Sequence, residues 1–224
     1  QKLAAADSEV GGNTKSYRAD LSNRDDVEQM ASALLADHDR LDIVVNNAGV
    51  LKSSNPILEG GLDIRFVVNT FAPYLLTKRL LPIIPKDGRV VNLSSAAQAP
   101  INPNVIQGTL RVDDMGAYAQ SKLAITIWTR ELAKELAAGP VMVAVNPGSL
   151  LASKMVKEGF GVAGNDLNIG ADILCDAALG DRFADASGKY FDNDRGQFAE
   201  PHPAAFDEKQ ATMVMKFSDQ YATQ

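Results

Sequence analysis

Two side chains that together could move a proton lie four residues apart, in the run Tyr118-Ala-Gln-Ser-Lys122. If this run is helical, the spacing places the phenol and the amine on one face, one turn apart. An ammonium beside a phenol favours the phenolate, and such a phenol can donate or accept a proton near neutral pH. The same pair also occurs at ordinary solvated helix starts, so its meaning depends on the elements that surround it.

The composition fits one α/β domain over residues 1–224 with a sizeable core. The 224 residues are 46% hydrophobic and carry a net charge of −6. An acidic chain without a basic run is a poor candidate for binding nucleic acid or an anionic membrane surface. There is no apolar run of 18 residues and no visible signal peptide, so we expect a soluble, cytoplasmic protein.

Cysteine and histidine usage gives no sign of a disulfide or a metal site. The one cysteine, Cys175, lies in an apolar helical stretch and is expected to be a buried small hydrophobe. The two histidines, His38 and His202, lie far apart in polar surroundings, and we expect a surface role for both.

Strand-like and helix-like patterns alternate along the chain, which predicts a doubly wound parallel sheet of the α/β class. The predicted strands are 14–18, 41–45, 89–93, 141–145 and an edge-like 188–191. The predicted helices are 22–38, with Ser22 or Asn23 as the cap, then 56–81, 118–136, 169–179 and 205–221. The segments 96–113 and 150–168 show no periodicity and are predicted to be irregular.

The unusual polar clusters fall where the predicted strands end. In a parallel sheet of this kind the ligand binds outside the carboxyl ends of the strands. The chain places Asp20, 46–49, Ser94-Ser95 and 146–148 at such ends, and the helix with Tyr118 and Lys122 follows one of them. This shared position is far more specific than any one of the clusters.

Taken in order, these residues resemble the short-chain dehydrogenase/reductase family over essentially the whole chain. The matching motifs are Asp20-Leu21, Asn46-Asn47-Ala48-Gly49, Asn69 in Val67-Val-Asn-Thr70, Ser95 in Val91-Asn-Leu-Ser-Ser95, Tyr118 with Lys122, and Pro147-Gly148. The long spacer from Ser95 to Tyr118 resembles the retinol-dehydrogenase-like branch. The resemblance implies a Rossmann-like fold.

The resemblance also implies hydride transfer between NAD or NADP and a carbonyl or alcohol carbon. It makes Asn69, Ser95, Tyr118 and Lys122 catalytic: Tyr118 as general acid in reduction and base in oxidation, Lys122 on its phenolate and the nicotinamide ribose, and Ser95 on the substrate oxygen. Cofactor contacts are implied for Asp20, Leu21, Asn46, Ala48, Gly49, Tyr118, Lys122, Pro147, Gly148 and Ser153. The family normally has a threonine where Ser153 is the nearest hydroxyl here, with Ser149 as the alternative.

Structural interpretations remain open beside these roles. Asp20 could cap the following helix. Ser95 could be an ordinary strand-end hydroxyl, although only one of Ser94 and Ser95 can face the site if the strand continues there. Pro73 has no N–H and leaves the Asn69 carbonyl without its helical partner. We therefore expect a bound water at that carbonyl, of the kind the family uses near its lysine; a simple kink is the alternative.

The glycine-rich phosphate loop of the family, Thr-Gly-x-x-x-Gly-x-Gly, does not occur in these 224 residues. We therefore expect the chain to be N-terminally incomplete and to lack the first two strands of the sheet, which also choose between NAD and NADP. The strand 14–18 would then have no neighbour, and strand 41–45 would have an exposed edge. The alternative function is a non-catalytic fragment that binds no dinucleotide by itself.

The predicted substrate is a small hydrophobic alcohol, aldehyde or ketone. Its pocket would be lined by 96–113 and by a lid at 150–168, both of which contain apolar residues. An extended-type relative acting on nucleotide sugars is disfavoured, because such enzymes usually add a larger C-terminal domain. The wide apolar faces of the helices 56–81 and 117–138, including Trp128 and Leu132, favour a homodimer, although a wide core stripe explains them almost as well.

Overall fold

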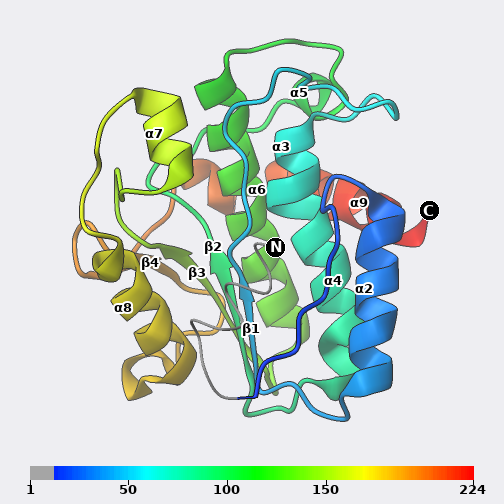
Figure 1. The fold of residues 1–224 in the computed structure, drawn as a ribbon, viewed down its shortest axis with the longest axis vertical. Helices are drawn as coiled ribbons and strands as arrows, with labels where there is room; N and C mark the ends of the chain where they lie inside the picture. The colour runs from blue at the N-terminus through cyan, green and yellow to red at the C-terminus, as the bar shows by residue number, and fades with distance from the viewer. Residues whose placement is uncertain (1–12) are drawn as a thin grey trace.

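A computed structural model describes residues 13–224, in which helices cover both faces of a mostly parallel sheet (Figure 1). The strands run in the order β1-β2-β3-β4-β5, and only β5 is antiparallel to its neighbour. The predicted α/β fold class is therefore confirmed. The strands are β1 (Ile43–Asn46), β2 (Arg89–Leu93), β3 (Val141–Asn146), β4 (Tyr190–Asp192) and β5 (Gln197–Ala199).

The strands β2 and β3 lie at the centre of the sheet because their alternating apolar residues fill a core on each face. On one face Val90 and Met142 pack with the large helical core, and on the other Val91 and Val143 join a smaller cluster under α8 (Leu167–Leu179). The bounds predicted for 89–93 are those observed.

Two predictions about the sheet's margins are wrong, and one is confirmed. Residues 14–18 form no strand, because no neighbouring strand in the described chain offers them hydrogen bonds. The segment predicted at 188–191 is not the edge, since β5 pairs with the outer side of β4. As expected, β1 has a free edge: it pairs only with β2 among the described residues, and Val45 is 41% exposed.

The helical run before β2 begins later than predicted and changes its winding. Asp63 caps it by accepting the Arg65 N–H at 2.9 Å, so 56–63 is loop and not helix. The run then passes from α3 (Ile64–Phe66) through the π-helical η1 (Val67–Phe71) to α4 (Ala72–Leu80), and η2 (Leu81–Ile83) ends it.

The helices elsewhere follow local capping signals. Asn23 caps α2 (Arg24–Asp37), and Asp113 caps α6 (Asp114–Glu135), which therefore starts one turn earlier than predicted. Ser153 caps α7 (Lys154–Phe160), a helix inside the segment 150–168 that was predicted to be irregular. The remaining elements are α5 (Pro103–Ile106), η3 (Asp181–Phe183), η4 (Pro203–Phe206) and α9 (Glu208–Thr223).

The C-terminal helix α9 supplies the packing partner that the sequence assigned to a second protomer. Tyr74 of α4 donates its hydroxyl to Asp219 of α9 at 2.5 Å, and Phe71 stacks on Tyr221 with ring centroids 5.5 Å apart. Trp128 and Leu132 are fully buried in this core. The apolar faces therefore give no support to the predicted dimer, because they are covered within one chain.

Two further predictions can be compared with the described residues. Cys175 is exposed on α8 and not buried, because the apolar face of that helix falls at Ile173 and Ala177 instead. His38 and His202 are half-buried near the surface. No helix in the part of the chain described here is both long and apolar enough to cross a membrane.

Candidate active site

Ser94 and Ser95, at the carboxyl end of β2, face opposite ways. The Ser94 hydroxyl is buried and shares a hydrogen bond with the Thr126 hydroxyl, with the two oxygens 2.6 Å apart. The Ser95 hydroxyl instead accepts the Ala97 N–H at 3.1 Å, and it lies close enough to the Tyr118 phenol to lower the pKa of that group. Of the two serines, Ser95 is therefore the one that meets the tyrosine, as the alternation along a strand predicts.

Tyr118 and Lys122 lie on one face of α6, beside the end of β2. The Lys122 ammonium is 5.6 Å from the centroid of the Tyr118 ring and donates to the Leu93 carbonyl at 2.6 Å. Lys122 is buried, whereas Tyr118 is half-buried. One serine, one phenol and one amine thus converge where β2 ends.

Burial dominates the proton affinities of this pair. It lowers the pKa of Lys122 to about 8, because the charged amine is taken out of water. It also raises the pKa of Tyr118, and the hydrogen bond from Ser95 opposes that rise only in part. The expectation that the ammonium makes Tyr118 more acidic is wrong for this structure: desolvation raises the pKa of the phenol, and the Lys122 ammonium is directed at the Leu93 carbonyl.

Asn69 of η1 clamps the loop after β1 to α6. Its side-chain oxygen accepts the Val50 N–H at 2.7 Å, and its amide donates to the Val50 carbonyl at 2.9 Å and to the Ser121 hydroxyl at 3.0 Å. Ser121 in turn donates to the Tyr118 carbonyl at 2.7 Å, and Thr70 donates to the Ser121 carbonyl at 2.9 Å. The side chain of Asn69 is therefore engaged in holding the helix that presents Tyr118.

The winding around Asn69 differs from an ordinary helix, which the sequence indicated only through Pro73. The Ala72 N–H reaches back five residues to the Val67 carbonyl, as in a π-bulge, and Pro73 has no N–H to offer the Asn69 carbonyl. Such bulges are frequent at functional sites. The water at the Asn69 carbonyl stays a prediction.

The loop after β1 brings a glycine against the same group. Asn46 ties this loop to its neighbours by donating to Asn92 at 2.7 Å and to Thr77 at 3.1 Å. A Cβ atom added to Gly49 would lie 3.3 Å from the Asn69 side-chain oxygen and 3.7 Å from the Lys122 nitrogen. The glycine therefore keeps the backbone open beside Lys122, a space that a bound cofactor can approach closely. Ala48 is exposed on this loop.

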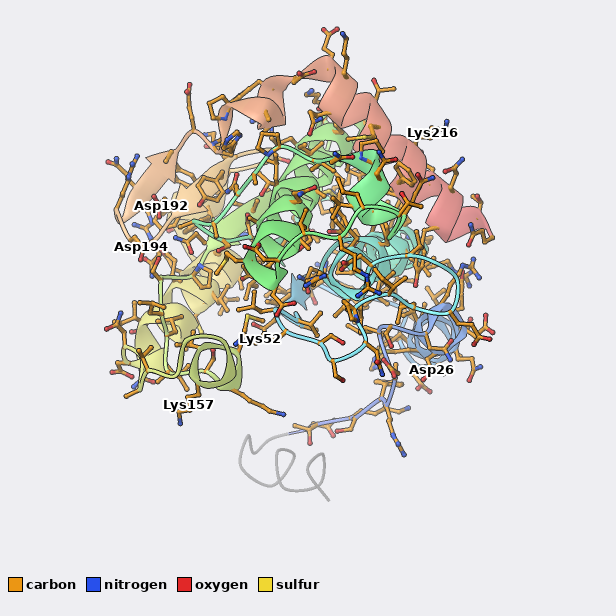
Figure 2. All side chains as sticks on the ribbon, turned by 90° about the horizontal axis from the view of Figure 1, so that it is seen from above. Asp26, Lys52, Lys157, Asp192, Asp194 and Lys216 are labelled. Atoms are coloured by element: carbon orange, nitrogen blue, oxygen red, sulfur yellow. The ribbon has the colours of Figure 1, made fainter. Side chains whose placement is uncertain are left out.

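The loop after β3 is held by the turn between β4 and β5, a contact that the sequence analysis missed. The Asp194 carboxylate accepts the Ser149 N–H at 2.8 Å, the Ser149 hydroxyl at 2.6 Å and the Asn146 amide at 2.9 Å. Asp192 accepts a second bond from Asn146 at 2.9 Å. Gly148 between them has φ +127°, a conformation that L side chains rarely adopt. Figure 2 shows Asp192 and Asp194 together at one side of the strand ends.

Ser149 and Ser153, the two candidates for the missing threonine, are both engaged. Ser149 is bonded to Asp194, and Ser153 accepts the Val156 N–H at 3.2 Å as the cap of α7. The helix α7 rests on the loop after β1, where a Cβ atom added to Gly159 would lie 2.8 Å from a Leu51 methyl carbon.

Asp20 and Leu21 lie before α2, and Asp20 is not its cap. The exposed Asp20 carboxylate accepts the Ser22 N–H at 2.9 Å and the Ser22 hydroxyl at 2.7 Å, and these bonds lower its pKa. The cap is Asn23, so the structural alternative for Asp20 is wrong. Leu21 packs against the large core.

Sequence comparisons show the family of the chain. The sequence model of the short chain dehydrogenase family matches residues 1–160, and the chain belongs to that family. It lies in the retinol-dehydrogenase-like branch. Retinol dehydrogenase 13 of Homo sapiens is 29% identical over 243 residues, which cover 94% of this chain and 71% of the relative. Retinol dehydrogenase 12 of Mus musculus is 34% identical over 209 residues, 85% of this chain and 66% of the relative.

Solved structures share the fold. An oxidoreductase of E. coli, yciK, is 26% identical with a TM-score of 0.63, over 86% of this chain and 79% of that one. An uncharacterized protein from Mycobacterium Paratuberculosis has a TM-score of 0.74 at 23% identity and covers 99% of this chain and 80% of its own. A short chain dehydrogenase from Burkholderia cenocepacia J2315, solved in complex with NADP, has a TM-score of 0.63 at 20% identity. The match covers 85% of this chain and 79% of that one.

Proposed function

We propose that the protein is a nicotinamide-dependent oxidoreductase that interconverts a carbonyl and an alcohol, with Tyr118 as the proton donor and acceptor. One observation supports this most directly: the Lys122 nitrogen lies 5.6 Å from the centroid of the Tyr118 ring on the same helix face, and Ser95 at the end of β2 is near enough to lower the pKa of Tyr118. A phenol with a hydroxyl and an amine beside it is suited to acid–base work on an oxygen atom.

A nicotinamide dinucleotide fits the chemistry of the residues around Lys122. The open backbone at Gly49, next to the Lys122 nitrogen, favours close approach of such a group. Residues proposed to contact it are Asp20, Leu21, Asn46, Ala48, Gly49, Tyr118, Lys122, Pro147, Gly148 and Ser153. When bound, the nicotinamide would supply or accept the hydride. The preference for NAD or NADP is to be measured by titration with each dinucleotide.

The protonation state of Tyr118 determines how the proton is transferred. Because burial raises its pKa, the phenol is protonated at neutral pH and can give its proton to the substrate oxygen as the carbonyl carbon gains a hydride. Ser95 would donate a hydrogen bond to that oxygen, and Asn69 would hold α6 in register. In the oxidising direction the deprotonated form of Tyr118 would take up the alcohol proton.

The proposed substrate is a hydrophobic alcohol, aldehyde or ketone. The segments 96–113 and 150–168, the second as a lid, are proposed to line its pocket. Both contain large apolar side chains that are exposed here, among them Leu110 at 42% and Leu150 at 45%. Two relatives are named retinol dehydrogenases, which agrees with an apolar substrate.

The test combines cofactor binding with carbonyl reduction. Fluorescence titration with NADH and NADPH is expected to show saturable binding of at least one of them. Tyr118→Phe is then expected to lower the rate of reduction of apolar aldehydes by about 100-fold or more, because the proton donor is lost. Tyr221→Phe is the matched control, since its buried hydroxyl has no hydrogen-bond partner among residues 13–224. Full activity of Tyr118→Phe would refute the mechanism, and absence of binding would favour the non-catalytic alternative.

A further inference from the structure

The carbonyl oxygen of Ser95 receives two hydrogen bonds from outside its own strand. The Tyr190 hydroxyl donates to it at 3.1 Å, and the Gln98 side-chain amide donates at 2.9 Å. Ser94, one residue earlier, still bonds into the sheet through its N–H, which donates to the Val145 carbonyl at 2.8 Å. Ser95 is the first residue beyond that bond, so its peptide depends on side chains for its orientation.

Both donors are themselves fixed in place. Tyr190 is 4% exposed on β4, whose side chains alternate between two faces. Phe191 points into the smaller core, while Asp192, on the same face as Tyr190, reaches Asn146. Gln98 is held by its side-chain oxygen, which accepts the His202 N–H at 3.0 Å.

The Tyr190 phenol is a permanent donor over the neutral range. Burial raises its pKa, and the nearby carboxylates of Asp192 and Asp194 raise it further. Its hydroxyl is therefore protonated whenever Tyr118 could act, and the Ser95 carbonyl keeps this partner independently of pH.

We propose that Tyr190 and Gln98 are positioning residues that hold Ser95 by its carbonyl, so that its hydroxyl faces Tyr118. The catalytic consequence rests on the proposed function, whereas the positioning itself does not. Neither residue touches the reacting atoms in this scheme. Both act through Ser95, and β4 thereby contributes to a site built at the end of β2.

The first test measures how firmly Ser95 is held and requires no catalytic activity. The Ala97 N–H is bonded to the Ser95 hydroxyl, so its hydrogen exchange reports how firmly that hydroxyl is held. Tyr190→Phe is expected to speed Ala97 exchange about fivefold, the effect of one ordinary hydrogen bond, while the amides of β3 keep their rates. Tyr221→Phe, which removes a hydroxyl without a partner in the described part of the chain, should leave Ala97 exchange unchanged. Unchanged exchange in Tyr190→Phe would overturn the proposal.

The second test asks whether Tyr190 acts through Ser95. Tyr190→Phe is expected to lower kcat about fivefold or more, and the double variant Ser95→Ala/Tyr190→Phe to be no slower than Ser95→Ala alone. Losses that multiply in the double variant would show an independent role and overturn the proposal. If even the unmodified protein reduces no carbonyl, the proposed function fails, and Ala97 exchange still decides the positioning.

Discussion

At the scale of single residues, the site combines an acid and a base that burial drives toward their neutral forms. The buried Lys122 amine loses hydration that its one bond to the Leu93 carbonyl replaces only in part, so its pKa falls to about 8. The pKa of Tyr118 rises for the same reason. The charged form of Lys122 is therefore unfavourable in the folded protein.

Replacing Lys122 by methionine is expected to change the pH dependence of stability. The folded pKa of about 8 lies below the ordinary lysine pKa of 10.5, so the unfolded chain binds more protons between these pH values. Stability of the native protein therefore rises from pH 8 to 10.5, and the penalty is fully present below pH 8. From the size of the pKa shift, the penalty for holding Lys122 charged in the folded protein is about 3 kcal/mol.

The measurement is urea unfolding of both proteins at pH 7, 9 and 10.5. The free energy of unfolding of Lys122→Met relative to the native protein is expected to fall by about 3 kcal/mol across this range. Lys134→Met, at an exposed lysine, controls for the loss of one charge. A difference that stays constant with pH would contradict the burial of a charged amine.

At the scale of elements, an ion pair network joins the starts of two helices. Arg65 at the start of α3 donates to Asp63, the cap of that helix, at 2.8 Å and to Asp114 at the start of α6 at 2.6 Å. Arg65 and Asp63 are both 3% exposed. Since Tyr118 lies one turn after Asp114, this network fixes the end of α6 that carries the phenol.

Arg65→Met is expected to destabilise the fold by about 3–5 kcal/mol, because it leaves the Asp63 carboxylate buried and unpaired. The matched control is Arg79→Met, which removes a pair with Glu28 at 3.0 Å from a side chain that is 43% exposed. That loss is expected to stay below about 1 kcal/mol. Chemical denaturation measures both, and equal effects would show that burial of the pair does not matter.

At the scale of the whole molecule, α9 closes the core formed by α4 and α6. Val214 lies at the centre of its inner face, 1% exposed, and Trp128 is buried beneath the same layer. Figure 2 shows Lys216, two residues on, at the outer side of the helix. The only tryptophan of the chain thus reports on whether α9 is docked.

Val214→Asp is expected to undock α9, because an unpaired carboxylate in this layer costs at least about 3 kcal/mol. The emission of Trp128 should shift to longer wavelength as water reaches the ring, and the thermal midpoint should fall by several degrees. Lys216→Asp introduces the same carboxylate on the outer face and is expected to behave like the native protein. An unshifted emission in Val214→Asp would show that α9 is not what seals the core.

Features that depend on neighbours along the chain could be predicted from local sequence patterns. The apolar run at 89–93 predicts β2, Ser22 or Asn23 was the predicted cap of α2, and the spacing of Tyr118 and Lys122 places both on one face of α6. Strand periodicity also predicted that only one of Ser94 and Ser95 can face the site, while the choice of Ser95 came from the family resemblance. These follow from the fixed geometry of helices and strands, which a local pattern is enough to reveal.

The burial of the site residues and the contacts between distant segments became visible only in the folded structure. The pKa of Tyr118 is raised by burial among segments far apart in the sequence. The hydrogen bonds from Tyr190 to Ser95 and from Ser149 to Asp194 also join such segments. The exposure of Cys175 and the covering of Trp128 by α9 depend equally on which faces meet. Desolvation and hydrogen-bond partners are properties of the packed chain, and no local pattern encodes them.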